Sequence, residues 1–412
     1  MKDINRLHTQ ALEMIKPIVA EIENKTFYQT AKVLEAFRHA QVYQHHLNGT
    51  NGYGYGDIGR EALEHVFATL FGAEAALVRP QFVSGTHAIA TALFAILRPG
   101  DTILFATGKP YDTLEKVIGF KNEPGSLRDW GINYRQIDLT SDDKIDIFTL
   151  QKLLEEDKSI RVVAFQRSRG YAWRKSLLQP DLTEAFALTK KIRPDVIIFV
   201  DNCYGELVEG FEPTQYGADL VAGSLIKNLG GGLAPTGGYI VGNKDLVNLA
   251  AERLTVPGTE GELGATGDFL RSTFHGLYLA PRMVAEALIG AIYAAALFSL
   301  AGFEVSPTIE EPRSDIIQAI KLNSAENMKA FCRGIQRFSP IDSHLTPEPW
   351  VMPGYDVPVI MAGGTFIAGS TAELSADGPL VPPYIIYFQG GLNRHHIFLA
   401  VQNALAEIIA RN

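Results

Sequence analysis

The sequence predicts an α/β protein with a large domain on a mostly parallel sheet and a smaller α+β domain after it. The chain of 412 residues is too long for one ordinary hydrophobic core. Short apolar runs alternate with helical stretches, which is typical of a parallel sheet covered on both faces. The pattern then changes to proline-bearing stretches and strand-like runs. We expect an N-terminal helical segment at 1–48, a large domain at 49–280, and a connecting helix with the small domain at 281–412.

Composition and charge exclude several classes of protein. The chain has 46% hydrophobic and 20% charged residues and a formal net charge of -9. This charge disfavours binding to nucleic acid or an anionic membrane and favours a small-molecule partner. Two cysteines, Cys203 and Cys332, are too few for a disulfide framework, and the N-terminus lacks the continuous apolar run of a signal peptide. We therefore expect a cytoplasmic protein.

The N-terminal elements follow from periodicity and glycine content. Residues 1–45 have apolar side chains at helical spacing, at Leu12, Ile15, Ile18, Val19 and Ile22. The stretch GTNGYGYGDIGR, residues 49–60, is too rich in glycine for a helix and leads into a helix at 61–71.

The large domain then alternates strands and helices. The expected strands are ALVRPQ, DTILFA, IRVVAFQ, VIIFVD, DLVAGSL and GGYIVG. Two helices are expected between the first three of these strands: THAIATALFAIL, and then YDTLEKVIG. In the C-terminal part, VIMAGGTFIAGS and YIIYFQGGL are strand-like and precede a closing helix.

One segment tests the choice between a globular and a membrane protein. Residues 283–303, MVAEALIGAIYAAALFSLAGF, carry Glu286 as their only charge and nearly reach membrane-spanning length. The segment is rich in alanine and stands alone, so we expect a buried helix between the domains or between subunits.

Polar side chains follow the predicted strands, at the sheet edge where open α/β sheets bind ligands. Ser84-Gly85-Thr86-His87 opens a helix, whose N-terminal amides and the two hydroxyls could bind a phosphate, although such hydroxyls also cap helices. Tyr111 could stack on a planar ring. Asp201 ends a buried run, where it could bind a cation or cap a helix.

Lys227 lies in GSLIKNLGGG, after an apolar pair and before three glycines. A lysine in such a setting either extends its amine to the surface or keeps it reactive for chemistry. With Ser224 three positions upstream, the strand-end residues together fit one ligand. That ligand has a phosphate, an aromatic ring with a basic nitrogen, and an aldehyde that reacts with an amine, as pyridoxal 5'-phosphate does.

The chain resembles the fold type I pyridoxal-phosphate enzymes, and within them the aluminium-resistance or methionine gamma-lyase-like proteins, relatives of cystathionine beta-lyase. The resemblance covers nearly the whole chain and rests on NGYGYGDIGR, QFVSGTHAI, FQRSRGY, VDNCYGELVE, GSLIKNLGGG and LSADGPLVPPYIIYFQGGL. It implies a seven-stranded, mostly parallel sheet, a role in amino acid metabolism, and a homodimer or homotetramer.

The resemblance also implies roles for individual residues. Lys227 would form the Schiff base with the cofactor and later remove the substrate's alpha proton, and Asp201 would pair with the ring nitrogen. Tyr111 would stack on the ring. The phosphate would be held by the turn Ser84, Gly85 and Thr86 together with Ser224.

The pattern breaks at two places. The lyases complete the phosphate site with a Tyr-x-Arg pair from the neighbouring subunit, and here Tyr55 matches but Asp57 replaces the arginine, for which Arg60 could substitute. The lyases also bind the substrate carboxylate with an arginine where this chain has Tyr387. We expect Arg169 to take that role, with Arg167 as the other choice, because a guanidinium binds a carboxylate through two parallel hydrogen bonds. A purely structural role for this arginine is the alternative.

The function that this implies is elimination of a beta or gamma leaving group, with cleavage of a carbon–sulfur bond in an amino acid. Two alternatives stay open: transamination or aldol cleavage on the same cofactor, and a non-catalytic binding or regulatory protein. The pairs His45-His46 and His395-His396 have no third ligand at metal spacing, so we expect no metal site.

Overall fold

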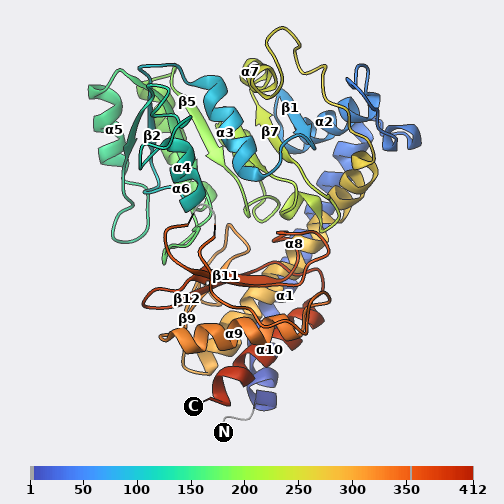
Figure 1. Ribbon diagram of the computed structural model, residues 1–412, viewed down its shortest axis with the longest axis vertical. Helices are drawn as coiled ribbons and strands as arrows, with labels where there is room; N and C mark the ends of the chain where they lie inside the picture. Colours follow the sequence, from blue (N-terminus) through green and yellow to red (C-terminus); the bar gives the residue numbers. More distant parts are fainter. Residues whose placement is uncertain (1–3, 353–354, 412) are drawn as a thin grey trace.

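The computed structural model describes residues 4–352 and 355–411 (Figure 1). Residues 1–3, 353–354 and 412, which belong to the first and last predicted domains, lie outside the described residues. The described chain contains two sheets, one in each half of the molecule.

The large sheet has seven strands in the order β1-β7-β6-β5-β4-β2-β3. Its strands are β1 (Ala75–Arg79), β2 (Thr102–Phe105), β3 (Asn133–Gln136), β4 (Ile160–Gln166), β5 (Ile197–Asp201), β6 (Leu220–Ser224) and β7 (Gly238–Gly242). All neighbouring pairs are parallel except those that β7 makes with β6 and β1. The predicted mostly parallel seven-stranded sheet is therefore confirmed.

Helices cover both faces of this sheet. They are α2 (Ile58–Phe71), α3 (Gly85–Ile96), α4 (Asp112–Ile118), α5 (Ile147–Glu156), α6 (Gln179–Ile192) and α7 (Lys244–Leu254). Side chains alternate along each strand, so Val162 packs with α3, α4 and α7 in one core cluster while Val163 packs with α2, α5 and α6 in the other. The central strands are buried on both sides for this reason.

The second sheet is antiparallel, with the order β10-β11-β12-β9-β8. Its strands are β8 (Glu304–Ser306), β9 (Gln318–Lys321), β10 (Val359–Ala362), β11 (Ser375–Pro379) and β12 (Ile385–Gln389), and its helices are α9 (Ala325–Arg337) and α10 (Arg394–Ile409). The α+β character predicted for the C-terminal part agrees with this. The domain boundaries themselves stay predictions, and the boundary at 280 falls inside helix α8 (Phe269–Leu300).

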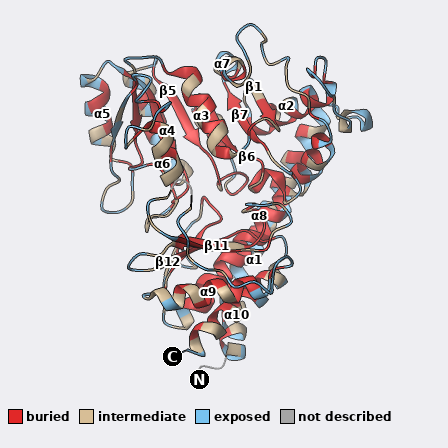
Figure 2. Ribbon diagram, viewed as in Figure 1, coloured by how far each residue is buried: buried red, intermediate tan, exposed pale blue. Residues whose placement is uncertain are grey.

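Helix α8 runs from the large sheet to the second sheet, and α1 (Ile4–His39) lies along it (Figure 1). It contains an 18-residue window that is long and apolar enough to cross a membrane, and 89% of that window is buried inside the structure. Figure 2 shows this burial along the helix. Glu286, the charge within the apolar segment, pairs with Arg394 at 2.6 Å. The expectation of a buried helix is confirmed.

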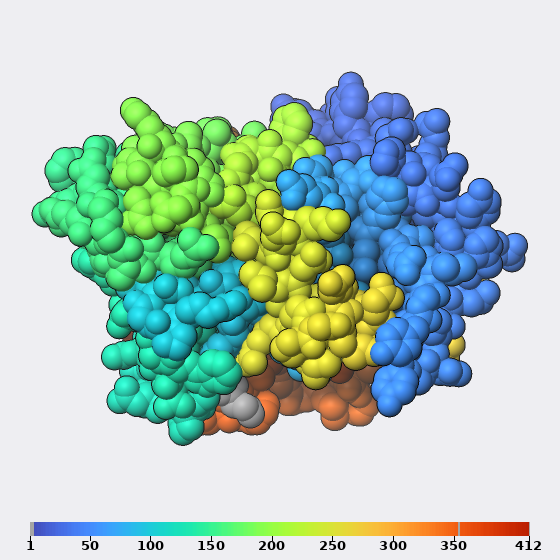
Figure 3. Space-filling view, turned by 90° about the horizontal axis from the view of Figure 1, so that it is seen from above, coloured from blue at the N-terminus to red at the C-terminus, as the bar shows by residue number. Residues whose placement is uncertain are grey.

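The glycine-rich loop before α2 is ordered by its own chain. Asp57 caps α2 by accepting a hydrogen bond from the Arg60 amide at 2.9 Å. The Arg60 guanidinium is buried and donates to the carbonyls of Gly54 and Gly264 at 2.8 and 3.1 Å. In Figure 3 the yellow segment that contains Gly264 lies against the blue N-terminal part. Arg60 therefore anchors this loop.

Candidate active site

A cavity of about 520 Å³ lies where the carboxyl ends of the large sheet's strands face the second sheet. Its walls include nine residues that the sequence singled out: Ser84, Gly85, Thr86, Tyr111, Arg169, Asp201, Ser224, Lys227 and Tyr387. All of these except Tyr387 lie at or just after strands of the large sheet, and they converge because parallel strands end at the same edge of a sheet. The role of each residue stays a prediction.

One wall is the N-terminus of α3, next to the end of β6. The Ser84 hydroxyl accepts a hydrogen bond from the His87 amide at 3.1 Å, so this side chain caps the helix. A β-carbon on Gly85 would lie 2.8 Å from the Ser224 β-carbon, so glycine lets the helix approach the strand. The first amides of a helix lack intrahelical acceptors, and beside the Ser224 hydroxyl they suit an anion such as a phosphate.

Tyr111 is held next to this turn by two hydrogen bonds. Its hydroxyl lies 2.8 Å from the Thr86 hydroxyl, and its backbone amide donates to the Gln166 side chain at 2.9 Å. Burial raises the pKa of Tyr111, so the phenol stays neutral. The ring is therefore held in the wall of the cavity, and its stacking on a planar ligand stays a prediction.

Asp201 ends β5 at the floor of the cavity and is buried. Its carboxylate accepts a hydrogen bond from the Cys203 amide at 3.1 Å. Burial raises the pKa of Asp201, while the charge of Lys227 and the hydrogen bonds from Cys203 act in the opposite direction. Such a carboxylate favours a positively charged partner, as a protonated ring nitrogen would be.

Lys227 is half-buried and lines the same cavity, and its Nζ lies 3.8 Å from the centre of the Tyr204 ring. Burial penalises the ammonium, but the neighbouring groups, Asp201 among them, raise the pKa of Lys227 well above its ordinary value. The amine therefore does not extend to the surface. Its position inside the cavity favours the reactive-amine interpretation over the surface interpretation.

Arg169 lies in the cavity wall just beyond β4 and is only 1% exposed. Its Nη1 donates to the Ser306 carbonyl and hydroxyl at 2.9 and 3.1 Å. Its Nε and Nη2 atoms are buried and have no hydrogen-bond partner among the described residues. Those two atoms form one edge of the guanidinium, which is the edge that binds a carboxylate through two parallel bonds.

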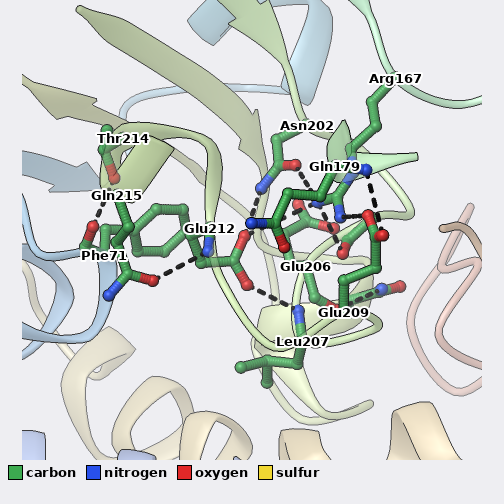
Figure 4. Close-up of polar contacts among 12 residues, drawn as sticks. Phe71, Arg167, Gln179, Asn202, Glu206, Leu207, Glu209, Glu212, Thr214 and Gln215 are labelled. Atoms are coloured by element: carbon green, nitrogen blue, oxygen red, sulfur yellow. Dashed lines mark hydrogen bonds and ion pairs between the residues drawn. The ribbon is translucent and has the colours of Figure 1, made fainter. Parts of the chain in front are cut away.

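Arg167 occupies a different environment (Figure 4). Its guanidinium is fully buried and donates to Asn202 at 2.8 Å and to Glu209 at 2.6 Å, and Glu212 lies 3.9 Å away. The positive charge of Arg167 is therefore balanced by these partners. Arg167 is not among the described residues that line the cavity. The structure therefore favours Arg169 over Arg167 as the residue available to a carboxylate.

Two candidate phosphate-site residues, Tyr55 and Arg60, do not line the cavity, and Arg60 is used in anchoring the loop. Tyr55 is the matched residue of the expected Tyr-x-Arg pair. It lies on the loop before α2 and is 64% exposed, near the exposed Tyr53. Its action in a neighbouring subunit stays a prediction.

The cavity also contains residues that the sequence analysis missed, notably Tyr171, Tyr204, Gln166 and Asp377. Tyr204 could have been found, because it follows Asp201 by three positions at the end of the same strand. Asp377 belongs to β11 of the second sheet, and no spacing in the sequence connects it with the strand ends. Among the described residues, no group of three or more His, Cys, Asp or Glu side chains could hold a metal ion.

Known proteins similar to this chain bear on its family. The methionine gamma-lyase family model matches residues 4–409. The uncharacterized protein YnbB of Bacillus subtilis (strain 168) is 46% identical over 399 residues, covering 96% of this chain and 94% of YnbB. A carbon–sulfur lyase involved in aluminum resistance from Clostridium novyi NT is 49% identical, with a TM-score of 0.95 over 98% of this chain and 96% of that one.

A more distant structure bears on the fold alone. The pyridoxal-5'-phosphate-dependent protein YhfS from Escherichia coli is 18% identical, with a TM-score of 0.63 over 94% of this chain and 97% of that one. This likeness agrees with the predicted fold type I architecture. The match of the family model over nearly the entire length is the stronger finding, and it shows that the chain belongs to the methionine gamma-lyase family.

Proposed function

We propose that this protein is a pyridoxal-phosphate-dependent lyase that cleaves a carbon–sulfur bond in an amino acid by beta- or gamma-elimination. The observation that carries the proposal is that Lys227 lines one cavity with Asp201, Ser224 and the N-terminus of α3. Membership of the methionine gamma-lyase family supports the same class of reaction.

The residues present fit the cofactor. The first turn of α3, with Thr86 and Ser224, would hold the phosphate. Tyr111 would lie against the ring, Asp201 would pair with the ring nitrogen, and the Lys227 amine would bond to the aldehyde. When bound, pyridoxal phosphate accepts the electrons that are left when the substrate's alpha proton is removed.

The chain's own residues would orient the substrate and move its proton. The free edge of the Arg169 guanidinium would bind the alpha-carboxylate, which fixes the alpha carbon relative to Lys227. The Lys227 Nζ would then take the alpha proton as a general base. The second-sheet wall, with Tyr387, would separate the reacting atoms from water.

A screen of sulfur-containing amino acids tests this function. Elimination releases a thiol, ammonia and an oxo acid in equal amounts. Transamination would give an oxo acid without ammonia or thiol, and aldol cleavage would release an aldehyde. A protein that binds the cofactor and releases none of these products from any tested substrate would favour the non-catalytic alternative.

We further propose that the active protein is a cytoplasmic homodimer or homotetramer in which Tyr55 enters the neighbouring subunit's site. Tyr53 and Tyr55 are 76% and 64% exposed on a loop that the chain itself holds in place, which leaves both rings free to contact a partner. The charge of -9 argues against nucleic acid or an anionic membrane as partner.

Mixing two inactive parents tests the shared site. If Tyr55 acts in the neighbouring subunit, a hybrid of Lys227→Ala and Tyr55→Phe chains has one site with both defects and one site with neither, so activity returns. If Tyr55 acts only in its own subunit, every hybrid site has one defect. Thiol release by the mixture at or below the parents' average would contradict the shared site.

A further inference from the structure

Asp377 is a buried carboxylate in the cavity wall that the proposed chemistry does not use. It lies on β11, opposite Tyr387 of β12, and only 6% of the residue is exposed. Gln389 donates to its Oδ2 at 3.2 Å, while its Oδ1 is buried and accepts no hydrogen bond from the described residues. A buried carboxylate oxygen without a hydrogen-bond donor destabilises the folded protein, so we expect Oδ1 to bind a donor when a ligand is present.

The charges within the protein do not supply that partner. Burial raises the pKa of Asp377 to about 6, although hydrogen bonding from Tyr171 and Gln389 and the charge of Lys227 each favour the ionised form. Lys227 is the cation among these groups, and the proposed function commits it to the cofactor. Asp377 would then face the cavity without a neighbouring positive charge.

The side chains around Asp377 are mainly tyrosines. Burial raises the pKa of Tyr171, Tyr204, Tyr355 and Tyr387, and the Asp377 carboxylate adds to the rise in each of them. The Tyr171 ring centre lies 6.0 Å from that of Tyr355 and 5.1 Å from that of Tyr387, and all four tyrosines line the cavity. Aromatic rings around a carboxylate are a setting that binds an ammonium group, through charge and through the ring faces.

Arg169 and Asp377 are positioned to bind opposite charges. Both residues line the same cavity, and so does Tyr387, which pairs with Asp377 across β11 and β12. Arg169 offers its free edge to a carboxylate, and Asp377 offers its free oxygen to a cation. The cavity can therefore hold a substrate that carries a second amino group beyond its alpha carbon.

We propose that Asp377, with the tyrosines around it, is a specificity residue that binds an ammonium group on the substrate's side chain. This inference rests on the proposed function and narrows its substrate class to sulfur amino acids whose leaving group carries an amine. Asp377 would act on substrate affinity, since no step of the elimination is assigned to it.

The test compares ligands that differ only by an ammonium in place of a methyl group. S-aminoethyl-L-cysteine and S-propyl-L-cysteine form one pair, read as kcat/KM for thiol release by the holoenzyme. L-ornithine and L-norleucine form a second pair without a sulfur leaving group, read as Kd by calorimetry. We expect the wild-type protein to prefer the ammonium member of each pair by about ten- to a hundredfold, as for a hydrogen bond to a charged group.

Asp377→Asn should bring both ratios close to one, mainly through KM and Kd rather than kcat. Tyr355→Leu keeps the Asp377 carboxylate and should reduce the preference for the ammonium ligand in part. This variant provides a second test if Asp377→Asn does not fold. Glu115→Gln is the matched control, because Glu115 is a partly exposed carboxylate that also lines the cavity and pairs with Lys109 at 2.7 Å. It should leave both ratios unchanged.

Three outcomes would overturn the inference: equal affinity for both members of each pair in the wild type, a preference that survives Asp377→Asn, or an equal fall of kcat for both substrates in that variant. The last result would make Asp377 a proton donor to the leaving sulfur. Failure of the proposed function would look different, because neither cysteine derivative would release thiol while the ornithine and norleucine affinities still report on Asp377.

Discussion

Replacing Lys227 by alanine is expected to lower the rate of carbon–sulfur elimination by about a hundred- to ten-thousand-fold, the range that a positioned general base contributes. The variant loses the amine that would bond to the cofactor aldehyde and also the group that would take the alpha proton. The measurement is thiol release under single-turnover conditions with cofactor in excess.

Lys109→Ala is the control for this variant. Lys109 also lines the cavity, but its amine is at the surface and pairs with Glu115 at 2.7 Å. We expect this variant to keep the wild-type rate and the cofactor absorbance. Comparable elimination by the Lys227→Ala and wild-type proteins would show that the base is another residue.

Arg169→Lys is expected to weaken binding of the amino acid substrate by about ten- to a hundredfold, or on the order of 1.5–3 kcal/mol, while the cofactor absorbance stays unchanged. Lysine keeps the charge but loses the planar edge formed by Nε and Nη2, and it cannot reproduce the contacts to Ser306 at the same time. Equilibrium titration of the holoenzyme with an unreactive amino acid gives the affinity.

Two comparisons make this result specific. Tyr387→Phe should cost less affinity, because the phenol offers a single neutral donor. Arg167→Lys should lower thermal stability rather than substrate affinity, since the Arg167 guanidinium is hydrogen-bonded to Asn202 and Glu209 inside the protein. Should Arg169→Lys bind normally while Tyr387→Phe abolishes binding, the carboxylate is held in another way, and an ordinary amino acid substrate would no longer be expected.

The cavity residues that belong to the large domain could be predicted from the sequence, because parallel strands bring distant residues to one edge of the sheet. Ser84, Tyr111, Asp201 and Lys227 each follow an apolar run, so their convergence follows from the sheet alone. The buried helix α8 was also predictable, since its composition and its isolation favour packing within a protein.

The rest depended on information that spacing does not contain. Arg167 and Arg169 are two positions apart, and the chain turns after β4, so only the folded structure shows which guanidinium meets Glu209 and which meets the cavity. Asp377 comes from a strand of the second sheet, and its position depends on how the two sheets pack. The role of Tyr55 depends on a second chain, so its assignment to the phosphate site stays a prediction.

The proposed function depends above all on a bond between the Lys227 amine and pyridoxal phosphate. Borohydride reduces the bond between a lysine amine and the cofactor aldehyde to a stable secondary amine, which survives proteolysis and can be located by peptide mass spectrometry. We expect the cofactor-saturated protein to absorb visible light, to lose that absorbance on reduction, and to yield the adduct on the peptide that contains Lys227. An adduct on a different lysine, or none at all in cofactor-saturated protein, would contradict the account.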